Sequence, residues 1–380
     1  MSNISVNTIT DASGGSTASI NGLTPQASNM AATFNRIING AMTVDQRNAG
    51  AAVTLAAVNP QYTLDRWCFQ TSQASKISTQ QNAGSVTPPV GFSNYLGITS
   101  LSAYSSVSSD YFDVVQKVEG FNTTDLGWGT ANAKTVTLSF LVQSSLTGTF
   151  SGAINNNAGG GGASYVFTYS IPVANTWTQI NVTVVGPTSG TWVGASNASS
   201  LFVLFNLGSG STFLTSTVNS WTTPGQYFGA TGSVSVVGTS GATFYITGVQ
   251  LEAGSTASSF AYENVGDTLQ KCQRYAYIVS AATQGSVYKR FGHGTATSGT
   301  SFRFMIPLLV PMRASPSFSF SGDPRVESGN GAANWSTVTN VAGKYTLTAD
   351  INTGASFASV SDSVLCDTGA AGIVAITAEL

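Results

Sequence analysis

Short segments in which apolar residues alternate with polar ones recur through residues 68–262. In KTVTLSFLVQSS the apolar positions are two residues apart, at Val136, Leu138, Phe140 and Val142. Successive side chains of a β-strand point to opposite faces, so this spacing is typical of a strand with one buried face. Glycine-rich turn signals separate the segments at the spacing of strands. The pattern predicts an antiparallel jelly-roll β-sandwich.

Two other segments fit strands less regularly. TWTQINVTVVG alternates less cleanly, beginning at Trp177, while SSLFVLFNLG (residues 199–208) is almost continuously apolar. Continuous apolar character is typical of a central strand that is covered on both faces. Both segments are therefore also predicted to be strands of the sandwich.

A strand, a short link and a helix are predicted over residues 244–275. Phe244, Ile246 and Gly248 lie two apart, as on one face of a strand. The following helix begins at a cap that either Asn264 or Asp267 provides. Leu269, Cys272 and Tyr275 are then expected on one side of that helix.

The few charged residues suggest three local ion pairs. Asp267 and Lys271 are four residues apart, which allows them to pair on the solvent face of the helix. Two further pairs are predicted to be structural and to hold strand ends, because a buried arginine is rarely left unpaired. These are Asp45 with Arg47, and Asp65 with Arg66. A functional role of these four residues is the alternative.

Charged side chains make up only 8% of the 380 residues, against roughly 25% in ordinary soluble proteins. Freely diffusing enzymes usually stay soluble through surface charge, so the shortage argues against that class. A formal net charge of −2 gives no case for a nucleic-acid partner. No apolar run approaches the roughly 18–20 residues of a membrane span, so no membrane insertion is expected. The opening MSNISVNTIT lacks the features of a secretory signal.

The cysteine and histidine content argues against several kinds of site. Cys68, Cys272 and Cys366 are widely spaced and form no CxxC motif, so a zinc knuckle is not expected. Buried free thiols are the favoured interpretation. The single histidine, His293, lies in a glycine-rich loop without the spacing of a nucleophile elbow. The sequence therefore predicts no cofactor.

Several longer motifs resemble tail-fibre and tail-appendage proteins of tailed bacteriophages. NRIINGAMTVDQR (35–47) and YTLDRW (62–67) resemble the opening of the jelly roll in that family, whose domain is similar to carbohydrate-binding modules. FYITGVQLEAG (244–254) and CQRY (272–275) resemble the last strand of this jelly roll and the helix that leads onward. PMRASP (311–316) and the final AEL resemble later parts of the same proteins.

The resemblance implies three parts of the chain. Residues 1–33 are expected to form an extended virion anchor, with a disordered leader as the alternative. Residues 34–262 are expected to form the jelly roll, and residues 263–380 a linking helix and a C-terminal β-sandwich domain. The expected fold is therefore all-β, with an extended N-terminal anchor, a jelly-roll β-sandwich, a short linking helix and a C-terminal β domain. The family also implies a homotrimer.

Carboxylates are unevenly distributed, which bears on catalysis. A glycosidase usually needs two of them, but no Asp or Glu occurs between Leu126 and Leu251, where Lys134 is the only charged residue. Four acids lie just before this region: Asp110, Asp113, Glu119 and Asp125. Solvated loop charges are the favoured interpretation, with a catalytic pair and a calcium site as alternatives. We predict that the chain is not an enzyme and binds no metal.

Aromatic residues are the main candidates for binding. The predicted glycan platform consists of four residues in or beside turn-rich segments: Trp128, Trp192, Trp221 and Tyr227. Phe228 belongs to the same aromatic set but is not counted in the platform. Aromatic faces next to Asn, Thr and Ser offer sugars an apolar surface and hydrogen bonds. The alternative for each ring is that it fills an end of the sandwich.

Together these features favour a structural protein of a tailed-phage virion, assembled in the host cytoplasm. A tail fibre or tail appendage is expected to attach the particle to a host surface glycan, while residues 1–33 contact other tail or baseplate proteins. A head fibre or capsid decoration protein is an alternative with the same expected fold. An envelope-glycan depolymerase is a second alternative, but it requires a parallel β-helix with regular repeats, and the sequence has no fixed-period repeat.

Overall fold

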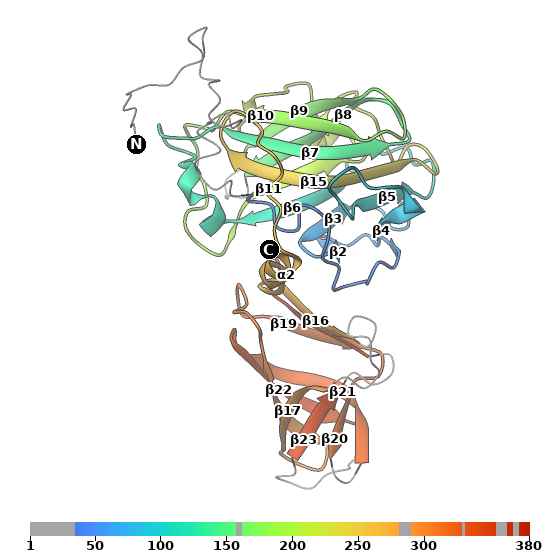
Figure 1. The fold of residues 1–380 in the computed structure, drawn as a ribbon, viewed down its shortest axis with the longest axis vertical. Helices are drawn as coiled ribbons and strands as arrows, with labels where there is room; N and C mark the ends of the chain where they lie inside the picture. Colours follow the sequence, from blue (N-terminus) through green and yellow to red (C-terminus); the bar gives the residue numbers. More distant parts are fainter. Residues whose placement is uncertain (1–34, 157–161, 281–289, 329–330, 355–362, 368–371) are drawn as a thin grey trace, which may run out of the picture.

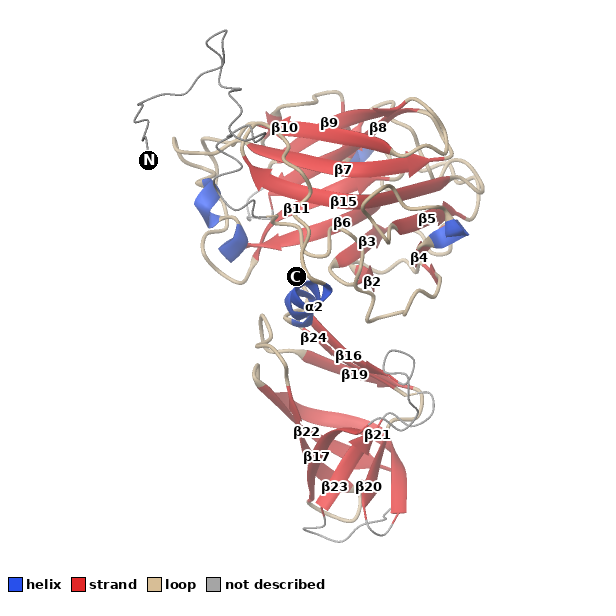
Figure 2. Ribbon diagram, in the orientation of Figure 1, coloured by secondary structure: helices blue, strands red, loops and turns tan. Residues whose placement is uncertain are grey.

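The computed structural model describes residues 35–156, 162–280, 290–328, 331–354, 363–367 and 372–380. This part of the chain is almost entirely β-structure, with one short α-helix between its two halves (Figures 1 and 2). The predicted all-β class is confirmed. The anchor expected at residues 1–33 lies outside the described residues. Within the described ranges, no helix is both long enough and apolar enough to cross a membrane.

Two antiparallel sheets form the jelly-roll sandwich. The first contains, in spatial order, β1 (Val53–Thr54), β4 (Ile77–Gln81), β5 (Leu96–Ser100), β15 (Thr243–Ala253), β7 (Val136–Ser144) and β10 (Thr178–Val184). The second contains β13 (Trp221–Thr222), β9 (Ser164–Ile171), β8 (Gly148–Asn156), β11 (Ser199–Asn206), β6 (Phe112–Glu119), β3 (Trp67–Thr71) and β2 (Gln61–Leu64). Strands that are adjacent in space are often distant in sequence, as jelly-roll connections require.

Short elements complete this half of the chain. A parallel pair joins β12 (Leu214–Thr215) to β14 (Gly229–Ala230). Turns of 3-10 helix occur at Ala83–Ser85, Gly120–Asn122, Thr124–Leu126 and Ser211–Phe213.

The sandwich core lies where the inner faces of the two sheets meet. β7 contributes all four residues whose spacing predicted a strand, and all four are buried: Val136, Leu138, Phe140 and Val142. Trp177, which fitted the alternation poorly, precedes β10 and packs instead with Tyr95 and Tyr245 on the outer face of the six-stranded sheet.

β11 is apolar on both faces because both of its faces are covered. Leu201, Val203 and Phe205 belong to the sandwich core. Phe202 and Leu204 point to the outer face of the seven-stranded sheet, where residues of the segment 211–230 pack over them. The nearly continuous apolar pattern therefore reflects a second, smaller apolar layer outside the sandwich.

β15 departs from the predicted alternation at Gly248. The ladder between β15 and β7 shifts register between Thr247 and Gln250, which is a β-bulge. Gly248 has a φ of 62°, a conformation that glycine adopts without a steric penalty. The bulge turns Val249 and Leu251 into the core in place of Gly248.

The linking helix α2 (Val265–Gln273) forms where the sequence predicts it. Asn264 occupies the N-cap position with an extended backbone, although its side chain makes no capping hydrogen bond. The predicted pair on the helix surface is wrong, because Lys271 pairs with Glu263, which lies before the helix, and not with Asp267. Cys272 is buried and free, as are the other two cysteines of the chain.

The second half contains a small sheet and a closed barrel where the sequence predicts a sandwich. The small sheet consists of β16 (Ala276–Ser280), β24 (Ile373–Thr377) and β19 (Ser317–Ser321). The barrel consists of β17 (Arg290–Ala296), β18 (Ser301–Pro307), β22 (Thr346–Thr353), β21 (Gly331–Ala342), β20 (Arg325–Ser328) and β23 (Ser363–Asp367).

The alternation of the barrel strands explains its closure. β18 and β22 alternate buried and exposed residues, so each has a single apolar face. A sheet with one apolar face can bury that face by closing on itself, without a second sheet. Phe302, Phe304 and Ile351 accordingly belong to one buried cluster.

Candidate functional site

A cleft of about 230 Å³ opens on the outer face of the seven-stranded sheet, and we call it the sheet cleft. Four aromatic residues line it: Tyr111, Phe202, Phe213 and Phe228. Five amide side chains complete the lining: Asn59, Gln70, Asn155, Asn156 and Gln226. No charged side chain of the described residues lines it. Rings supply apolar faces and amides supply donors and acceptors, so this lining suits an uncharged polar ligand.

The sheet register sets the floor of the sheet cleft. On β11, Phe202 lies opposite Lys117 of β6 and Asn155 of β8. On β3, Gln70 lies opposite Asp113 of β6. Neighbours of this kind project from the same face of a sheet, so rigid strands hold the floor residues in place.

A packed group of aromatic rings forms the wall. Phe213 and Phe228 stack with ring centroids 4.7 Å apart and an interplanar angle of 3°. Tyr111 meets both rings edge-on, at 5.3 and 6.1 Å. The Tyr111 hydroxyl accepts a hydrogen bond from Asn59 Nδ2 at 2.6 Å. Because these contacts fix the rings against one another, little ordering of the wall is needed on binding.

Two buried polar groups beside the sheet cleft lack partners among the described residues. Asn155 Nδ2 donates to the Tyr227 carbonyl at 3.2 Å, but its Oδ1 accepts nothing. Neither oxygen of Asp113 has a hydrogen bond of normal geometry. Burial raises the pKa of Asp113 well above its ordinary value, and the nearby Ser209 hydroxyl offsets only part of this shift. Unsatisfied buried groups cost about 1–3 kcal/mol each, so this floor is poorly optimised for stability.

The structure brings together three of the four predicted platform residues. Trp128, Trp192 and Trp221 contact one another edge-to-face, with centroids 4.9–5.5 Å apart. Each indole N–H donates to a main-chain carbonyl, of Lys134, Ser189 and Val185 respectively. Trp128 is 8% exposed, while the other two are partly buried. A hollow of about 200 Å³ beside Trp128 and Trp192 is also lined by threonine and serine hydroxyls.

The tryptophan platform remains a prediction, and its rings can be tested separately from the sheet cleft. If the platform binds glycan, Trp192→Ala and Trp221→Ala should each weaken binding of a neutral oligosaccharide by about 1–3 kcal/mol. Only Lys134 carries charge in this region of the sequence, so this binding should change little across a salt series. Variants that fold and bind normally, or a collapse of wild-type binding in modest salt, would contradict the platform.

Tyr227 lies apart from the tryptophans and next to the sheet cleft. Its main-chain N–H donates to Ser164 Oγ at 2.9 Å, and its ring belongs to the apolar layer over the outer face. Its neighbours Gln226 and Phe228 line the cleft. The sequence analysis selected this segment as part of the platform and did not predict the cleft that it borders.

The four acids that precede the charge-free region are not the solvated loop charges that the sequence favours. Asp110, Asp113 and Glu119 are buried, and only Asp125 is exposed. Burial acts to raise the pKa of Asp110, but the hydrogen bonds that its carboxylate accepts hold the pKa below its ordinary value. Glu119 and Asp125 are bound by arginines. In the described part of the chain, no group of three or more His, Cys, Asp or Glu is arranged to hold a metal ion.

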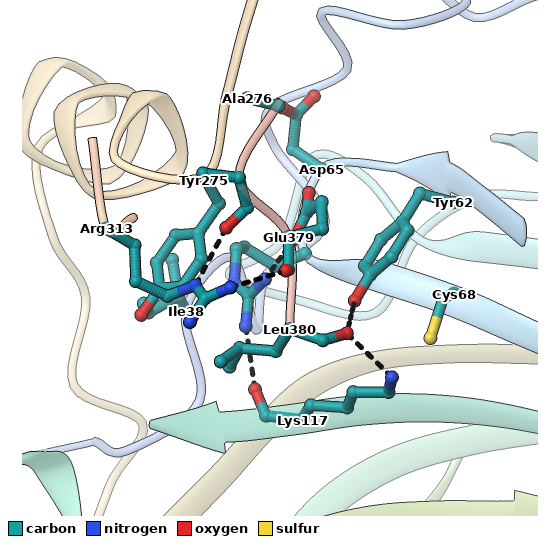
Figure 3. A network of polar contacts seen from close by, with 12 residues as sticks. Ile38, Tyr62, Asp65, Cys68, Lys117, Tyr275, Ala276, Arg313, Glu379 and Leu380 are labelled. Atoms are coloured by element: carbon teal, nitrogen blue, oxygen red, sulfur yellow. Dashed lines mark hydrogen bonds and ion pairs between the residues drawn. The ribbon is translucent and has the colours of Figure 1, made fainter. Parts of the chain in front are cut away.

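The two halves of the chain meet through buried charged and polar side chains, which we call the junction network (Figure 3). Glu379 is at its centre: one carboxylate oxygen accepts from Arg47 Nη2 at 2.6 Å and the other from Arg66 Nη1. The Arg66 guanidinium, 1% exposed, lies 3.6 Å from the ring centroid of Tyr275. Burial acts to lower the pKa of Arg66, but Glu379, Tyr275, Tyr62 and Cys272 together raise the pKa above its ordinary value. The predicted pairing of these arginines with Asp45 and Asp65 is therefore wrong.

A second ion pair and several main-chain acceptors complete the junction network. Glu119 accepts from Arg274 Nη2 at 2.6 Å and from the Tyr275 hydroxyl at 2.5 Å. Arg313 donates to three main-chain carbonyls, one of them Asn197 of the sandwich. Lys117 Nζ donates to the main-chain oxygen of Leu380 at 2.6 Å.

Asp65 links the network to the small sheet. It accepts from the main-chain N–H and the side-chain amide of Gln46, and the same amide donates to the Ala276 carbonyl at 3.0 Å. Burial raises the pKa of Asp65 to about 6, despite the opposing effects of Arg47 and these hydrogen bonds.

The junction network explains what several sequence motifs do. DQR (45–47), DRW (65–67), CQRY (272–275), PMR (311–313) and AEL (378–380) are far apart in the chain, yet each supplies a member of this network. These motif residues therefore position the two halves relative to each other. The sequence analysis did not predict which residues these charged side chains pair with. The signal present in the sequence was that the few charged residues of the chain are concentrated in these motifs.

Comparisons with known proteins were made with sequence families, curated sequences and solved structures. No family model and no curated protein matches. The enzymatically active domain of tailspike protein 4 of bacteriophage CBA120 has a TM-score of 0.32 and 13% identity, over 58% of this chain and 21% of that one. A putative sugar binding protein from Bacteroides thetaiotaomicron has a TM-score of 0.34 and 12% identity, over 58% and 100%. The family 11 carbohydrate-binding module of Lic26A-Cel5E from Clostridium thermocellum has a TM-score of 0.27 and 12% identity, over 54% of this chain and 96% of that one. The chain thus covers about a fifth of the tailspike domain. TM-scores this low carry no functional argument.

Proposed function

We propose that the chain is a glycan-binding attachment protein and that the sheet cleft holds the glycan. The observation that carries this proposal is the lining of the cleft, with four aromatic rings, five amides and no charge among the described residues. A sugar ring has apolar C–H faces and a rim of hydroxyls, which rings and amides complement. Phosphate-bearing ligands need cationic partners, which this lining does not offer.

The proposed setting is the virion of a tailed phage, as a tail fibre or tail appendage. The motifs at 35–47, 62–67, 272–275 and 311–316 support this setting by their resemblance to that family. In this proposal residues 1–33 contact tail or baseplate proteins, and the chain forms a homotrimer in which several weak glycan contacts add together. Assembly takes place in the host cytoplasm. A head fibre or capsid decoration protein remains the alternative with the same fold.

The proposal also holds that the glycan is bound without being cleaved. Hydrolysis by a carboxylate pair needs two acids that are free to act on the sugar. Asp110 and Glu119 are buried and hydrogen-bonded within the protein, and Asp125 is held by both terminal nitrogens of Arg36 at 2.8 Å. Asp113 is buried beside the sheet cleft but has no second carboxylate paired with it among the described residues.

Binding to an array of neutral and acidic oligosaccharides tests the proposal, followed by calorimetric titration of the best neutral binder. Phe202→Ala is expected to weaken that binding by about 1–3 kcal/mol, because the ring is the floor of the cleft. The dissociation constant should change less than about twofold between low and high salt, because no ion pair is screened. The matched control is Phe121→Ala, which removes an exposed ring that does not line the cleft.

The same mixtures, assayed for new reducing ends, test the absence of hydrolysis. No release is expected from the wild type over hours of incubation. Turnover that disappears in Asp113→Asn or Glu119→Gln would contradict the non-catalytic proposal. If the wild type and a folded Phe202→Ala variant bind the oligosaccharide with equal affinity, the sheet cleft is not the binding site.

A further inference from the structure

A further aromatic cluster borders a hollow that shares no lining residue with the sheet cleft. Phe92, Phe260 and Tyr262 contact one another, with ring centroids 5.0–5.4 Å apart. Together they border a hollow of about 140 Å³, which we call the aromatic pocket. Its volume corresponds to roughly five water molecules, which is enough for one small ring and too little for a chain of them.

Exposure distinguishes this cluster from ordinary packing. Tyr262 is 60% exposed, and the adjacent apolar residues Val90 and Val265 are 101% and 62% exposed. A cluster that only fastened the link to the sandwich would gain stability by burying these groups. Exposed aromatic surface with a polar rim is instead typical of a binding site.

The rim of the aromatic pocket supplies hydrogen-bonding groups. Ser93 is exposed on it. Glu263 also lines it, and its carboxylate accepts from Lys271 and from Thr268. A carboxylate accepts about four hydrogen bonds in total, so Glu263 retains capacity for ligand hydroxyls. The aromatic pocket therefore combines stacking faces with both a hydroxyl and a carboxylate acceptor.

We infer that the aromatic pocket is a saccharide-binding site, separate from the sheet cleft, that takes a single neutral sugar ring. The sugar stacks on the exposed face of Tyr262, and its hydroxyls bond Glu263 and Ser93. This arrangement complements an apolar ring face and a hydroxyl rim at the same time. An anionic sugar is disfavoured, because Glu263 would repel it.

Ligand binding here is expected to affect the connection between the two halves. The walls come from three segments: residues 35–43, the loop at 91–93, and residues 260–268, which include the start of α2. A bound ring contacts the sandwich and the link together. Local opening of the link then requires loss of the ligand, so binding should slow its amide exchange.

The test uses the full chain with four monosaccharide probes at millimolar concentration: glucose, galactose, mannose and N-acetylglucosamine. Saturation-transfer NMR titrations are expected to give saturable binding of at least one. Tyr262→Ala should weaken it by at least about tenfold and Glu263→Gln by at least about threefold. Hydrogen exchange of residues 260–268 should slow with sugar in the wild type and not in Tyr262→Ala. The matched control is Tyr345→Ala, which removes another exposed tyrosine, 72% exposed, that does not line the pocket.

The outcomes separate this inference from the proposed function. Phe202→Ala should retain monosaccharide binding at the aromatic pocket while losing oligosaccharide binding at the sheet cleft. The inference is overturned if the wild type saturates with none of the four sugars, or if a folded Tyr262→Ala binds as the wild type does. Should Tyr262→Ala lack a cooperative unfolding transition, unchanged binding by Glu263→Gln overturns it instead.

Discussion

Replacing Glu379 by glutamine is expected to lower the free energy of unfolding by about 3–5 kcal/mol, the usual cost of removing one partner from a buried ion pair. The change keeps the shape of the side chain and removes only its charge. Arg47 and the almost fully buried Arg66 then lose the carboxylate that both of them contact. Urea denaturation at neutral pH measures the effect, and we expect the two halves to unfold in separate transitions.

Asp350→Asn is the matched control for this prediction. Asp350 pairs with the exposed Arg303 on the barrel surface, and loss of such surface pairs typically costs less than about 1 kcal/mol. A Glu379→Gln variant no less stable than Asp350→Asn would show that the junction network contributes little to stability. Unfolding of Glu379→Gln in a single cooperative transition, with the urea midpoint of the wild type, would show the same.

Asp113→Asn is expected to stabilise the protein at neutral and alkaline pH, by on the order of 1–3 kcal/mol. Burial holds the pKa of Asp113 in the folded state above its unfolded value, so the folded state binds the proton more tightly. Stability from such a group is fully present below the unfolded pKa and is lost as the pH rises through the folded pKa. Asparagine removes the ionisation and with it this loss.

The pH profile provides the measurement. Asp65, with a pKa of about 6, also has its folded-state pKa raised above the unfolded value. Wild-type stability should therefore fall as the pH rises from about 4 through 6. Each group contributes at most about 1.4 kcal/mol per pH unit. Asp113→Asn should make the free energy of unfolding less dependent on pH, while the decrease caused by Asp65 remains. Wild-type stability that rises from pH 5 to 8, together with a less stable Asp113→Asn at pH 8, would contradict the assignment.

The strands of the sandwich could be predicted because side-chain direction in a strand is a local property. The spacing of Val136 and Leu138 was sufficient to place β7 in the core. The bulge at Gly248 could not be predicted, since it depends on how β15 pairs with β7. The closed barrel was missed for the same kind of reason: alternation shows that a face is buried but not what buries it.

The candidate sites could likewise be predicted only in part from the sequence. Sequence reasoning selected Trp128, Trp192 and Trp221, which the fold does gather, but it missed the sheet cleft. Phe202 looked like a core residue because its strand is apolar on both faces. A strand with two apolar faces must be packed against other residues on both sides. On the outer side of the sheet, amides on other strands, such as Gln70, lie where this second packing layer ends and the cleft begins. That reasoning requires the strand order, which depends on contacts between distant residues.

The pairing of Glu379 with Arg47 and Arg66 has a consequence for synthesis of the chain. Glu379 lies 332 and 313 residues after these arginines, so the ribosome makes the sandwich strands long before their counterion exists. Until then both guanidinium groups must remain hydrated, and the face of the sandwich around β2 and β3 stays open to water. Domains generally fold as units during translation, so the sandwich can complete its core early. The junction, in contrast, closes only after the ribosome has added Glu379, so its closure follows the folding of the sandwich.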